Sequence, residues 1–193
     1  LLGPMAEAQA WPSYKAAITS LSPTSGPRAG GNDVVITGDN FTNVKYVKFG
    51  NTRADFTVDS PAQITATAPA RFWPGTVDVR VANDCGISED TSADNYTYLL
   101  KPWVILVYPS SGPASGGTQV TIVGTGFTAD STVNFGPNPA TSQRVYSSVF
   151  MTATSPVGTG VVDVTVTTPG GTSATSFLDR FHYTKVTPEV TTW

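Results

Sequence analysis

Hydrophobic and polar residues alternate along this chain with a period of two. Val77, Val79 and Val81, for example, are separated by Asp78 and Arg80. Because successive side chains of a β-strand point to opposite faces, this pattern buries one face of a sheet and leaves the other in water. Turn signals rich in Gly, Pro, Asn and Asp separate the alternating segments. In the first half of the chain we expect strands at about residues 17–22, 33–38, 44–49, 53–58, 62–68, 75–82 and 94–99.

The same pattern occurs twice along the chain. The segment Leu21–Gly31 aligns with Val107–Gly117 at an offset of 86 residues (107 − 21). Further on, Val77–Val81 aligns with Val162–Val166 at an offset of 85 (162 − 77). We place this change in the loop at residues 69–75 and its counterpart, because loops tolerate insertions and deletions. The chain is therefore an internal repeat of two similar modules.

Seven short strands with one buried face, within about 80 residues, predict two packed antiparallel sheets. We therefore expect an all-β fold with two immunoglobulin-like β-sandwich domains in tandem. The expected core of the first domain consists of Val34, Ile36, Phe41, Phe49, Ile64, Ala66, Val77, Val79, Val81 and Tyr98. The expected core of the second domain consists of Val120, Ile122, Phe127, Phe135, Phe150, Val162, Val164, Val166 and Tyr183.

The repeat also suggests where the domains begin and end. We expect an N-terminal extension, a first sandwich, a short linker, a second sandwich and a C-terminal tail, at residues 1–15, 16–99, 100–103, 104–184 and 185–193. Pro102 stiffens the linker, because its ring fixes φ and keeps the preceding residue extended. Trp103 follows directly at the junction. Pro102 and Trp103 are therefore the candidate interdomain contacts, and we expect a rigid pair of domains.

The repeated residues resemble the IPT/TIG domain family. The shared pattern is Pro-x-x-Gly-Pro-x-x-Gly-Gly-x-x-Val-x-Ile-x-Gly-x-x-Phe, followed by Phe-Gly and Val-Asp-Val-x-Val. It runs from Pro23 to Phe41 and again from Pro109 to Phe127, and the segment 168–173 is similar to bacterial members. The resemblance implies an immunoglobulin-like sandwich of bacterial or phage type. It does not imply a single function, because the family occurs in receptors, surface proteins, enzymes and virion proteins.

Charge and composition argue against several function classes. The chain has 11 Lys and Arg against 14 Asp and Glu, whereas a nucleic-acid-binding protein carries a basic face. The one cysteine, Cys85, cannot form an internal disulfide. The one histidine, His182, lies on the last expected strand with no recognisable nucleophile. We therefore expect no catalytic residue, no metal ligand and no cofactor, and we do not expect an enzyme.

Aromatic residues in irregular segments are the candidate partner contacts. The string Arg71-Phe72-Trp73-Pro74 interrupts a turn whose counterpart in the second copy is small. Exposed aromatic rings at a loop tip often mark a contact site, but they also fold back onto a domain, and we weigh these two interpretations equally. The segments outside the repeats hold further aromatic residues. The candidate contacts are Phe72, Trp73, Trp11, Tyr14 and Trp193.

Three functions are weighed on these grounds. We favour a non-catalytic structural or adhesive module, extracellular, on a phage virion or a bacterial cell surface, which acts through contacts with other protein subunits. The alternative is a carbohydrate-binding accessory module, in which Trp11, Phe72 and Trp73 stack on a surface glycan. A DNA-binding sandwich is disfavoured by the acidic charge and by the absence of basic contact loops. We expect no membrane span, because the sequence has no run of 18 apolar residues.

Overall fold

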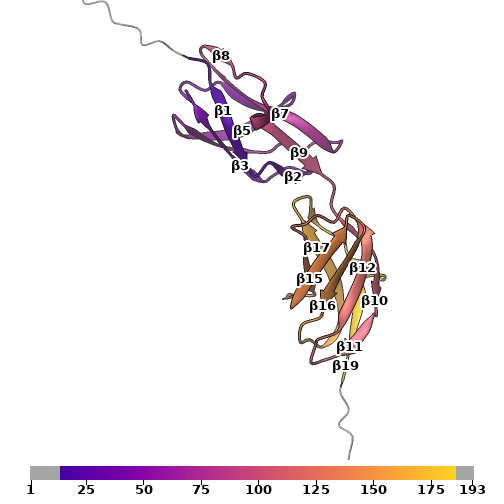
Figure 1. Ribbon diagram of the computed structural model, residues 1–193. Coiled ribbons are helices and arrows are strands. Elements are labelled where there is room, and N and C mark those ends of the chain that lie inside the picture. Colours follow the sequence, from indigo (N-terminus) through magenta and orange to yellow (C-terminus); the bar gives the residue numbers. More distant parts are fainter. Residues whose placement is uncertain (1–13, 186–193) are drawn as a thin grey trace, which may run out of the picture. The chain divides into compact units, whose positions relative to one another are not determined.

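The computed structural model describes residues 14–185 and divides the chain into two compact units, Leu1–Tyr98 and Leu99–Trp193. Each unit is a sandwich of β-strands (Figure 1). The predicted all-β fold, with two immunoglobulin-like domains in tandem, is therefore confirmed. Within the described residues, no helix is long and apolar enough to cross a membrane.

The first unit contains the seven strands expected from the alternation and adds two short strands and a 3-10 turn. The elements are β1 (Ala17–Ser22), β2 (Ser25–Pro27), β3 (Asp33–Asp39), β4 (Tyr46–Phe49), β5 (Thr52–Ser60), β6 (Gln63–Thr67), β7 (Gly75–Asn83), β8 (Gly86–Ile87), η1 (Ser92–Asp94) and β9 (Asn95–Leu99). The strands follow the order β1-β3-β6-β5-β4-β7-β9-β2, and β8 pairs with β7. One end of β5 pairs with β4 and the other with β6, so this strand passes from one layer to the other.

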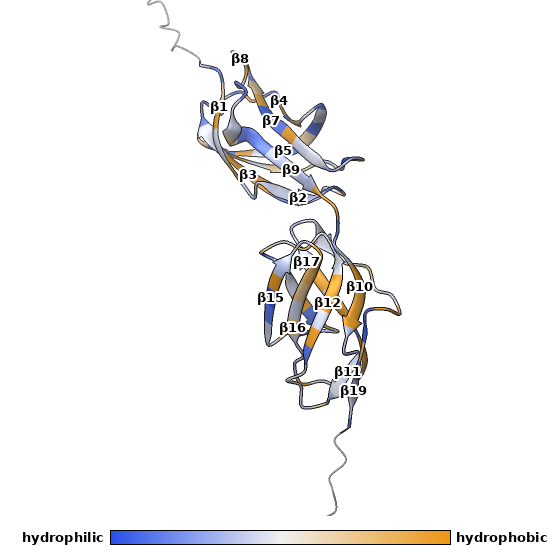
Figure 2. Cartoon of the chain, turned by 45° about the vertical axis from the view of Figure 1, so that its right-hand side comes forward, coloured by the Kyte–Doolittle hydropathy of each residue, from blue (hydrophilic) through white to orange (hydrophobic). Residues whose placement is uncertain are grey.

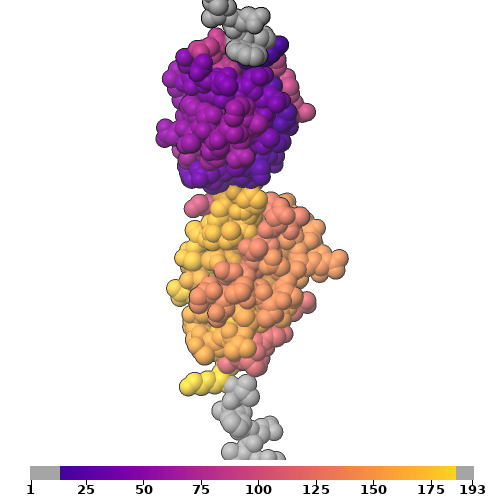
Figure 3. All heavy atoms as spheres, turned by 90° about the vertical axis from the view of Figure 1, so that its left-hand side faces the viewer, coloured from indigo at the N-terminus to yellow at the C-terminus, as the bar shows by residue number. Residues whose placement is uncertain are grey.

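The second unit repeats this architecture with two separate sheets. Its strands are β10 (Trp103–Tyr108), β11 (Ser111–Pro113), β12 (Gln119–Thr125), β13 (Thr132–Phe135), β14 (Asn138–Pro139), β15 (Ser142–Ser147), β16 (Phe150–Thr154), β17 (Gly160–Thr168), β18 (Gly171–Thr172) and β19 (Arg180–Thr184). One sheet has the order β10-β12-β16-β15, and the other has the order β11-β19-β17-β13-β14. In the space-filling view, amber residues from the end of this unit lie directly against salmon residues from its beginning (Figure 3).

A proline and one inserted residue explain why β5 of the first unit becomes two strands in the second. Asn134 pairs with Pro139, in the place where Lys48 pairs with Arg53. Proline has no backbone N–H, so it cannot donate to the ladder. Thr141 then follows as an extra residue between the two pairings that the first unit makes without a gap. The strand therefore ends at β14, and the chain begins again as β15 in the other sheet.

The first core agrees with the sequence prediction. Every expected residue is buried except Val77, which is half-buried against the core, and its counterpart Val162 is half-buried in the second unit. The prediction missed Tyr96, which is fully buried and packs edge to face on Phe49 with ring centroids 5.1 Å apart. The Tyr96 hydroxyl accepts a hydrogen bond from Asn32 Nδ2 at 2.9 Å, which satisfies its polar atom inside the core.

The second core corrects one prediction. Phe150 was expected inside, but its side chain is 37% exposed, and Met151 is fully buried in its place. Met151 pairs with Ile122 as Ile64 pairs with Ile36, so the offset between the copies is 87 (151 − 64) in this strand. A shift of one residue turns every side chain of a strand to the opposite face. The inserted residue in front of β15 therefore moves Phe150 from the core to the surface.

Gly38 and Gly124 occupy matched places in β3 and β12, where no larger residue fits. A Cβ atom at either position would collide with a carbonyl oxygen of the neighbouring edge strand and with the ring of Phe41 or Phe127. Both rings are buried. The Gly-x-x-Phe part of the repeat is therefore one packing unit, in which the glycine makes room for the aromatic ring.

Candidate functional site

The loop between β6 and β7 presents two exposed aromatic rings. Phe72 and Trp73 are 73% and 70% exposed, and their ring centroids lie 4.8 Å apart at an interplanar angle of 89°. Arg28 Nη1 donates a hydrogen bond to the carbonyl oxygen of Phe72 at 2.8 Å. Arg28, Arg71 and Phe72 also line a shallow hollow of about 380 Å³. The loop therefore combines exposed rings with two guanidinium groups.

The remaining predicted contacts differ in exposure. Tyr14 is 62% exposed and borders a second hollow of about 370 Å³. Trp11 and Trp193 lie outside the described residues. Pro102 is buried, whereas Trp103, the first residue of β10, is largely exposed. The roles of all five residues as contacts stay predictions.

One outward sheet face of the second unit carries a row of apolar side chains. Leu106 on β10 pairs with Val123 on β12, and Val123 pairs with Phe150 on β16, so these residues lie side by side across three strands. Tyr146 occupies the bulge of β15 next to Phe150, with ring centroids 5.3 Å apart. Residues next to them along each strand, such as Met151, point into the core. We call Leu106, Val123, Tyr146 and Phe150 the apolar row.

The same four places in the first unit carry polar residues. Ser20 pairs with Thr37, and Thr37 pairs with Gln63. Asp59 occupies the matching bulge of β5. Its Oδ2 accepts hydrogen bonds from Gln63 Nε2 at 3.3 Å and from Thr65 Oγ1 at 2.8 Å. Two sheets with the same register therefore differ on their outward faces, one with hydrogen-bonded polar groups and one with apolar side chains.

The edge strand β10 extends the apolar surface. Strands β1 and β10 have the same alternation of buried and exposed positions. At the exposed positions, β1 carries Ala17, Thr19, Ser20 and Ser22, whereas β10 carries Trp103, Ile105, Leu106 and Tyr108. Figure 2 shows hydrophobic colour along β10 and β12. Because these side chains do not fill the core, folding does not explain them, and contiguous exposed apolar residues often mark an interaction site.

Arg144 on β15 is the charged residue of this face. Within the four strands of the sheet, no other residue is charged. Its guanidinium carbon lies 4.9 Å from the centre of the Tyr146 ring, a distance at which the ring attracts the cation. The apolar row is therefore bordered along the strands by Tyr108, Thr121, Thr152 and Arg144, which place one positive charge beside Tyr146.

The sequence prediction missed the apolar row for an identifiable reason. It assigned Phe150 to the core, and it judged aromatic residues by their position in loops. The available signal was the comparison of outward positions in the two copies, which already distinguishes Trp103-Val-Ile-Leu-Val-Tyr108 from Ala17-Ile-Thr-Ser-Leu-Ser22. The insertion in front of β15 hid the remaining part of that signal.

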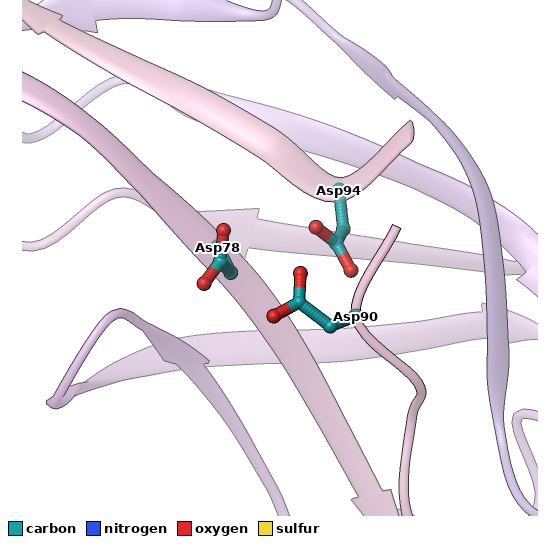
Figure 4. Close-up of side chains that lie close together, drawn as sticks. All are labelled: Asp78, Asp90 and Asp94. Carbon is teal, nitrogen blue, oxygen red and sulfur yellow. The ribbon is translucent and has the colours of Figure 1, made fainter. Parts of the chain in front are cut away.

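Three carboxylates of the first unit converge in space (Figure 4). Asp78 lies on β7, Asp90 lies in the loop after β8, and Asp94 ends η1, with one oxygen of each within 4.8 Å of the others. Asp94 is fully buried. Its Oδ2 accepts a hydrogen bond from the backbone N–H of Thr91 at 3.2 Å, and its Oδ1 has no hydrogen-bond partner. Burial raises the pKa of the Asp94 carboxyl above its ordinary value.

Arg80 lies on one side of this acidic cluster. Its Nη2 is 2.9 Å from Asp90 Oδ2, and its Nη1 is 4.0 Å from Asp94 Oδ2. Nη1 also donates a hydrogen bond to the carbonyl oxygen of Ser88 at 2.9 Å. The guanidinium is therefore held in place and compensates part of the negative charge.

The second unit keeps only part of this arrangement. Asp163 and Asp179 take the places of Asp78 and Asp94, whereas the counterparts of Asp90 and Arg80 are threonines 175 and 165. Asp179 is fully buried, and its Oδ1 also lacks a partner. Burial, with a contribution from the neighbouring Asp163, raises the pKa of the Asp179 carboxyl.

Known proteins with similar sequences include plexins and Fibrocystin-L of animals. Human Plexin-A4 is 34% identical over 140 residues, which cover 66% of this chain and 7% of that protein. Plexin-2 of Caenorhabditis elegans is 28% identical over 159 residues, which cover 75% of this chain and 8% of that protein. Human Fibrocystin-L is 26% identical over 125 residues, which cover 59% of this chain and 3% of that protein. The chain thus spans less than a tenth of the length of these relatives.

Solved structures and the family profile agree on the fold. The full extracellular region of plexin A4, domains 1 to 10, superposes with a TM-score of 0.63 at 22% identity, and the match covers 95% of this chain and 17% of that one. The profile of the IPT/TIG domain matches residues 16–99 and again residues 102–183. The chain therefore belongs to the IPT/TIG domain family and contains two copies of that domain.

Proposed function

We propose that this chain is a non-catalytic extracellular interaction module whose second domain binds another protein through the apolar row. One observation carries the proposal. At four matched places on equivalent sheets, the first domain has Ser20, Thr37, Asp59 and Gln63, and the second has Leu106, Val123, Tyr146 and Phe150. Both sheets fold with the same strand pairings. The apolar residues at these four positions of the second domain therefore serve a purpose other than folding.

The chemistry of the face favours a protein partner. Complete burial of one large apolar side chain contributes about 1.5–3 kcal/mol, and a few central aromatic residues supply most of the affinity of protein interfaces. Arg144 supplies the positive charge beside Tyr146. The matching partner surface is therefore apolar at its centre and carries a carboxylate opposite Arg144.

The extracellular setting is supported by the relatives. The match to plexin A4 falls in a region described as extracellular, and the matched relatives are animal proteins. The location on a phage virion or a bacterial cell surface, expected from the sequence, stays a prediction. The proposal requires only that the chain is displayed where another protein reaches the outer face of β10, β12, β15 and β16.

Site-specific photo-crosslinking tests the proposal. Thr152 lies on β16, between the pairings with β12 and β15, and Thr65 occupies the same place in the first domain. With a photo-reactive residue at 152, on cells or particles that display the chain, we expect a crosslink to a second protein. The double variant Tyr146→Asp, Phe150→Gln, which installs the residues of the first domain, should reduce that crosslink at least tenfold.

The matched control is the photo-reactive residue at 65. We expect it to give little crosslinking, because Asp59 and Gln63 keep that face polar. Equal crosslinking from both domains, or crosslinking unchanged by the double variant, would show that the apolar row is not the binding surface.

A second candidate function uses the other exposed aromatic residues. Phe72 and Trp73 present their rings beside Arg28 and Arg71, and exposed rings flanked by hydrogen-bond donors suit the stacking of a sugar. If the loop binds glycan, the wild-type chain is retained on insoluble polysaccharide and Trp73→Ala is released. Trp103→Ala is the control for general loss of a surface tryptophan. Equal elution of wild type and Trp73→Ala would remove this candidate.

A further inference from the structure

The acidic cluster of the first domain holds more negative charge than its surroundings compensate. Asp78, Asp90 and Asp94 place three carboxyl oxygens within 4.8 Å of one another. The positive group that contacts them is the single guanidinium of Arg80. When all three carboxyls are ionised, the cluster carries a net charge of −2. Like charges at such distances repel strongly where protein replaces water, so the ionised cluster requires a further positive charge.

A buried oxygen shows where that charge belongs. Asp94 is fully buried, and its Oδ1 has no hydrogen-bond partner. Its other oxygen already accepts from Thr91 and faces Arg80. In Figure 4 the Asp90 carboxylate lies between those of Asp78 and Asp94. Since buried polar atoms nearly always have a partner, Oδ1 marks a ligand position inside the cluster.

The second domain provides the comparison. It keeps the pair of the partly exposed Asp163 and the buried Asp179, and Asp179 Oδ1 also lacks a partner. One proton shared between two carboxyls satisfies such a pair. The first domain adds Asp90 as a third carboxylate from a loop, together with Arg80, which fixes it at 2.9 Å. With a shared proton on Asp78 and Asp94 and Arg80 paired with Asp90, the cluster still keeps a net charge of −1, whereas a cation uses all three carboxylates.

We propose that Asp78, Asp90 and Asp94 of the first domain bind a divalent cation, with calcium as the best match. All three ligands are carboxylate oxygens, which calcium and magnesium prefer, and no cysteine or histidine is in the cluster. Calcium accepts irregular geometry and completes its coordination with water, whereas magnesium demands a near-ideal octahedron. Asp90 lies in an irregular loop, which suits calcium. Three carboxylates beside an arginine predict weak binding, with a dissociation constant of about 10⁻⁴–10⁻³ M.

Thermal unfolding of the full chain tests this site. Calcium chloride at about ten times the expected dissociation constant stabilises the folded domain by about 1.4 kcal/mol and should raise the unfolding temperature of the first domain by about 6–11 °C. Sodium chloride at the same ionic strength should give no comparable shift. Asp90→Asn should abolish the calcium shift, measured against the same variant in chelator. The Asp90 side chain is 68% exposed, so the variant should fold, and circular dichroism checks this.

The matched control is Asp163→Asn in the second domain, which should keep the calcium shift. Isothermal titration of the wild type with calcium should give one site per chain. If sodium chloride reproduces the shift, if Asp90→Asn retains it, or if titration shows no binding, the cluster is not a cation site. Asp94 would then be a buried carboxyl beside a second aspartate, as Asp179 is in the second domain.

Discussion

Each domain has one fully buried carboxyl, Asp94 in the first and Asp179 in the second, and the two have different neighbours. Asp179 has one neighbour of its own kind, Asp163, and accepts a hydrogen bond from the backbone N–H of Ser176 at 2.7 Å. Asp94 has two such neighbours and a guanidinium. Burial raises the pKa of both groups. The consequence for stability is clearest at Asp179, because Thr165 replaces Arg80 in the second domain and the nearby Arg180 pairs with Asp163 at 3.8 Å.

The variant Asp179→Asn should stabilise the protein at pH 7 and lose this advantage near pH 3.5. The folded pKa of Asp179 lies above its ordinary value of 3.8. The stabilising contribution of the wild-type Asp179 carboxyl, which comes from its protonated form, is therefore fully present below about pH 3.8. It is lost as the pH rises through the folded pKa. Asparagine stays neutral at both pH values, so we expect the free energy of unfolding of the variant to exceed that of the wild type by about 1–3 kcal/mol at pH 7. Urea unfolding at both pH values measures it.

The control for this prediction is Asp130→Asn, which removes an exposed carboxylate from the same domain. This substitution should change the free energy of unfolding by no more than about 0.5 kcal/mol at both pH values. A destabilised Asp179→Asn at pH 7 would mean that the ionised carboxylate has a favourable partner in the folded state.

At the scale of elements, the register of β16 decides which residues build the core and which build the surface. Thr141 and Pro139 interrupt the strand that is continuous in the first domain. The interruption shifts the alignment of the following hairpin by one residue. Met151 then faces inward and Phe150 faces outward. A small change in one loop therefore altered the chemistry of a whole sheet face without altering the fold.

Paired truncations test this register. Met151→Ala should lower the free energy of unfolding by about 2–5 kcal/mol, because it leaves a cavity in the core. Phe150→Ala should lower the free energy of unfolding by only about 1 kcal/mol, because the ring is partly exposed and packs against the ring of Tyr146 on the surface. Denaturant titration of the second domain's transition measures both. A larger loss for Phe150→Ala than for Met151→Ala would contradict the register.

The repeat explains how much of this could be predicted from the sequence. Alternation and turn residues located the seven strands of the first domain, because burial on one face fixes the period of two. The same reasoning failed at Phe150, because a one-residue insertion is invisible without knowing which residues pair across strands. It also failed at Asp90 and Asp94, which come together only when the loop after β8 lies against β7. Contacts between distant segments are set by the fold and leave no local pattern.

For the whole molecule, duplication separates what the domain needs for folding from what each copy does. Both copies keep the valine-rich core, the Gly-x-x-Phe packing unit and an aspartate pair with one buried carboxyl. They differ in the outward face of one sheet and in the third carboxylate. The shared features account for the family, and the differences are where we place the proposed protein contact and cation site.

The pairing of the last strand determines how the second domain responds to tension. β11 and β19 run parallel, with Ser111, Gly112 and Pro113 opposite His182, Tyr183 and Thr184. A pull on both ends of the domain draws β19 toward its C-terminus and β11 toward its N-terminus, so the two strands slide along each other. All the bonds of this ladder then bear force at once and must break together, whereas a peeling geometry would break them one at a time. This arrangement makes the second domain more resistant to mechanical unfolding than a peeling geometry would.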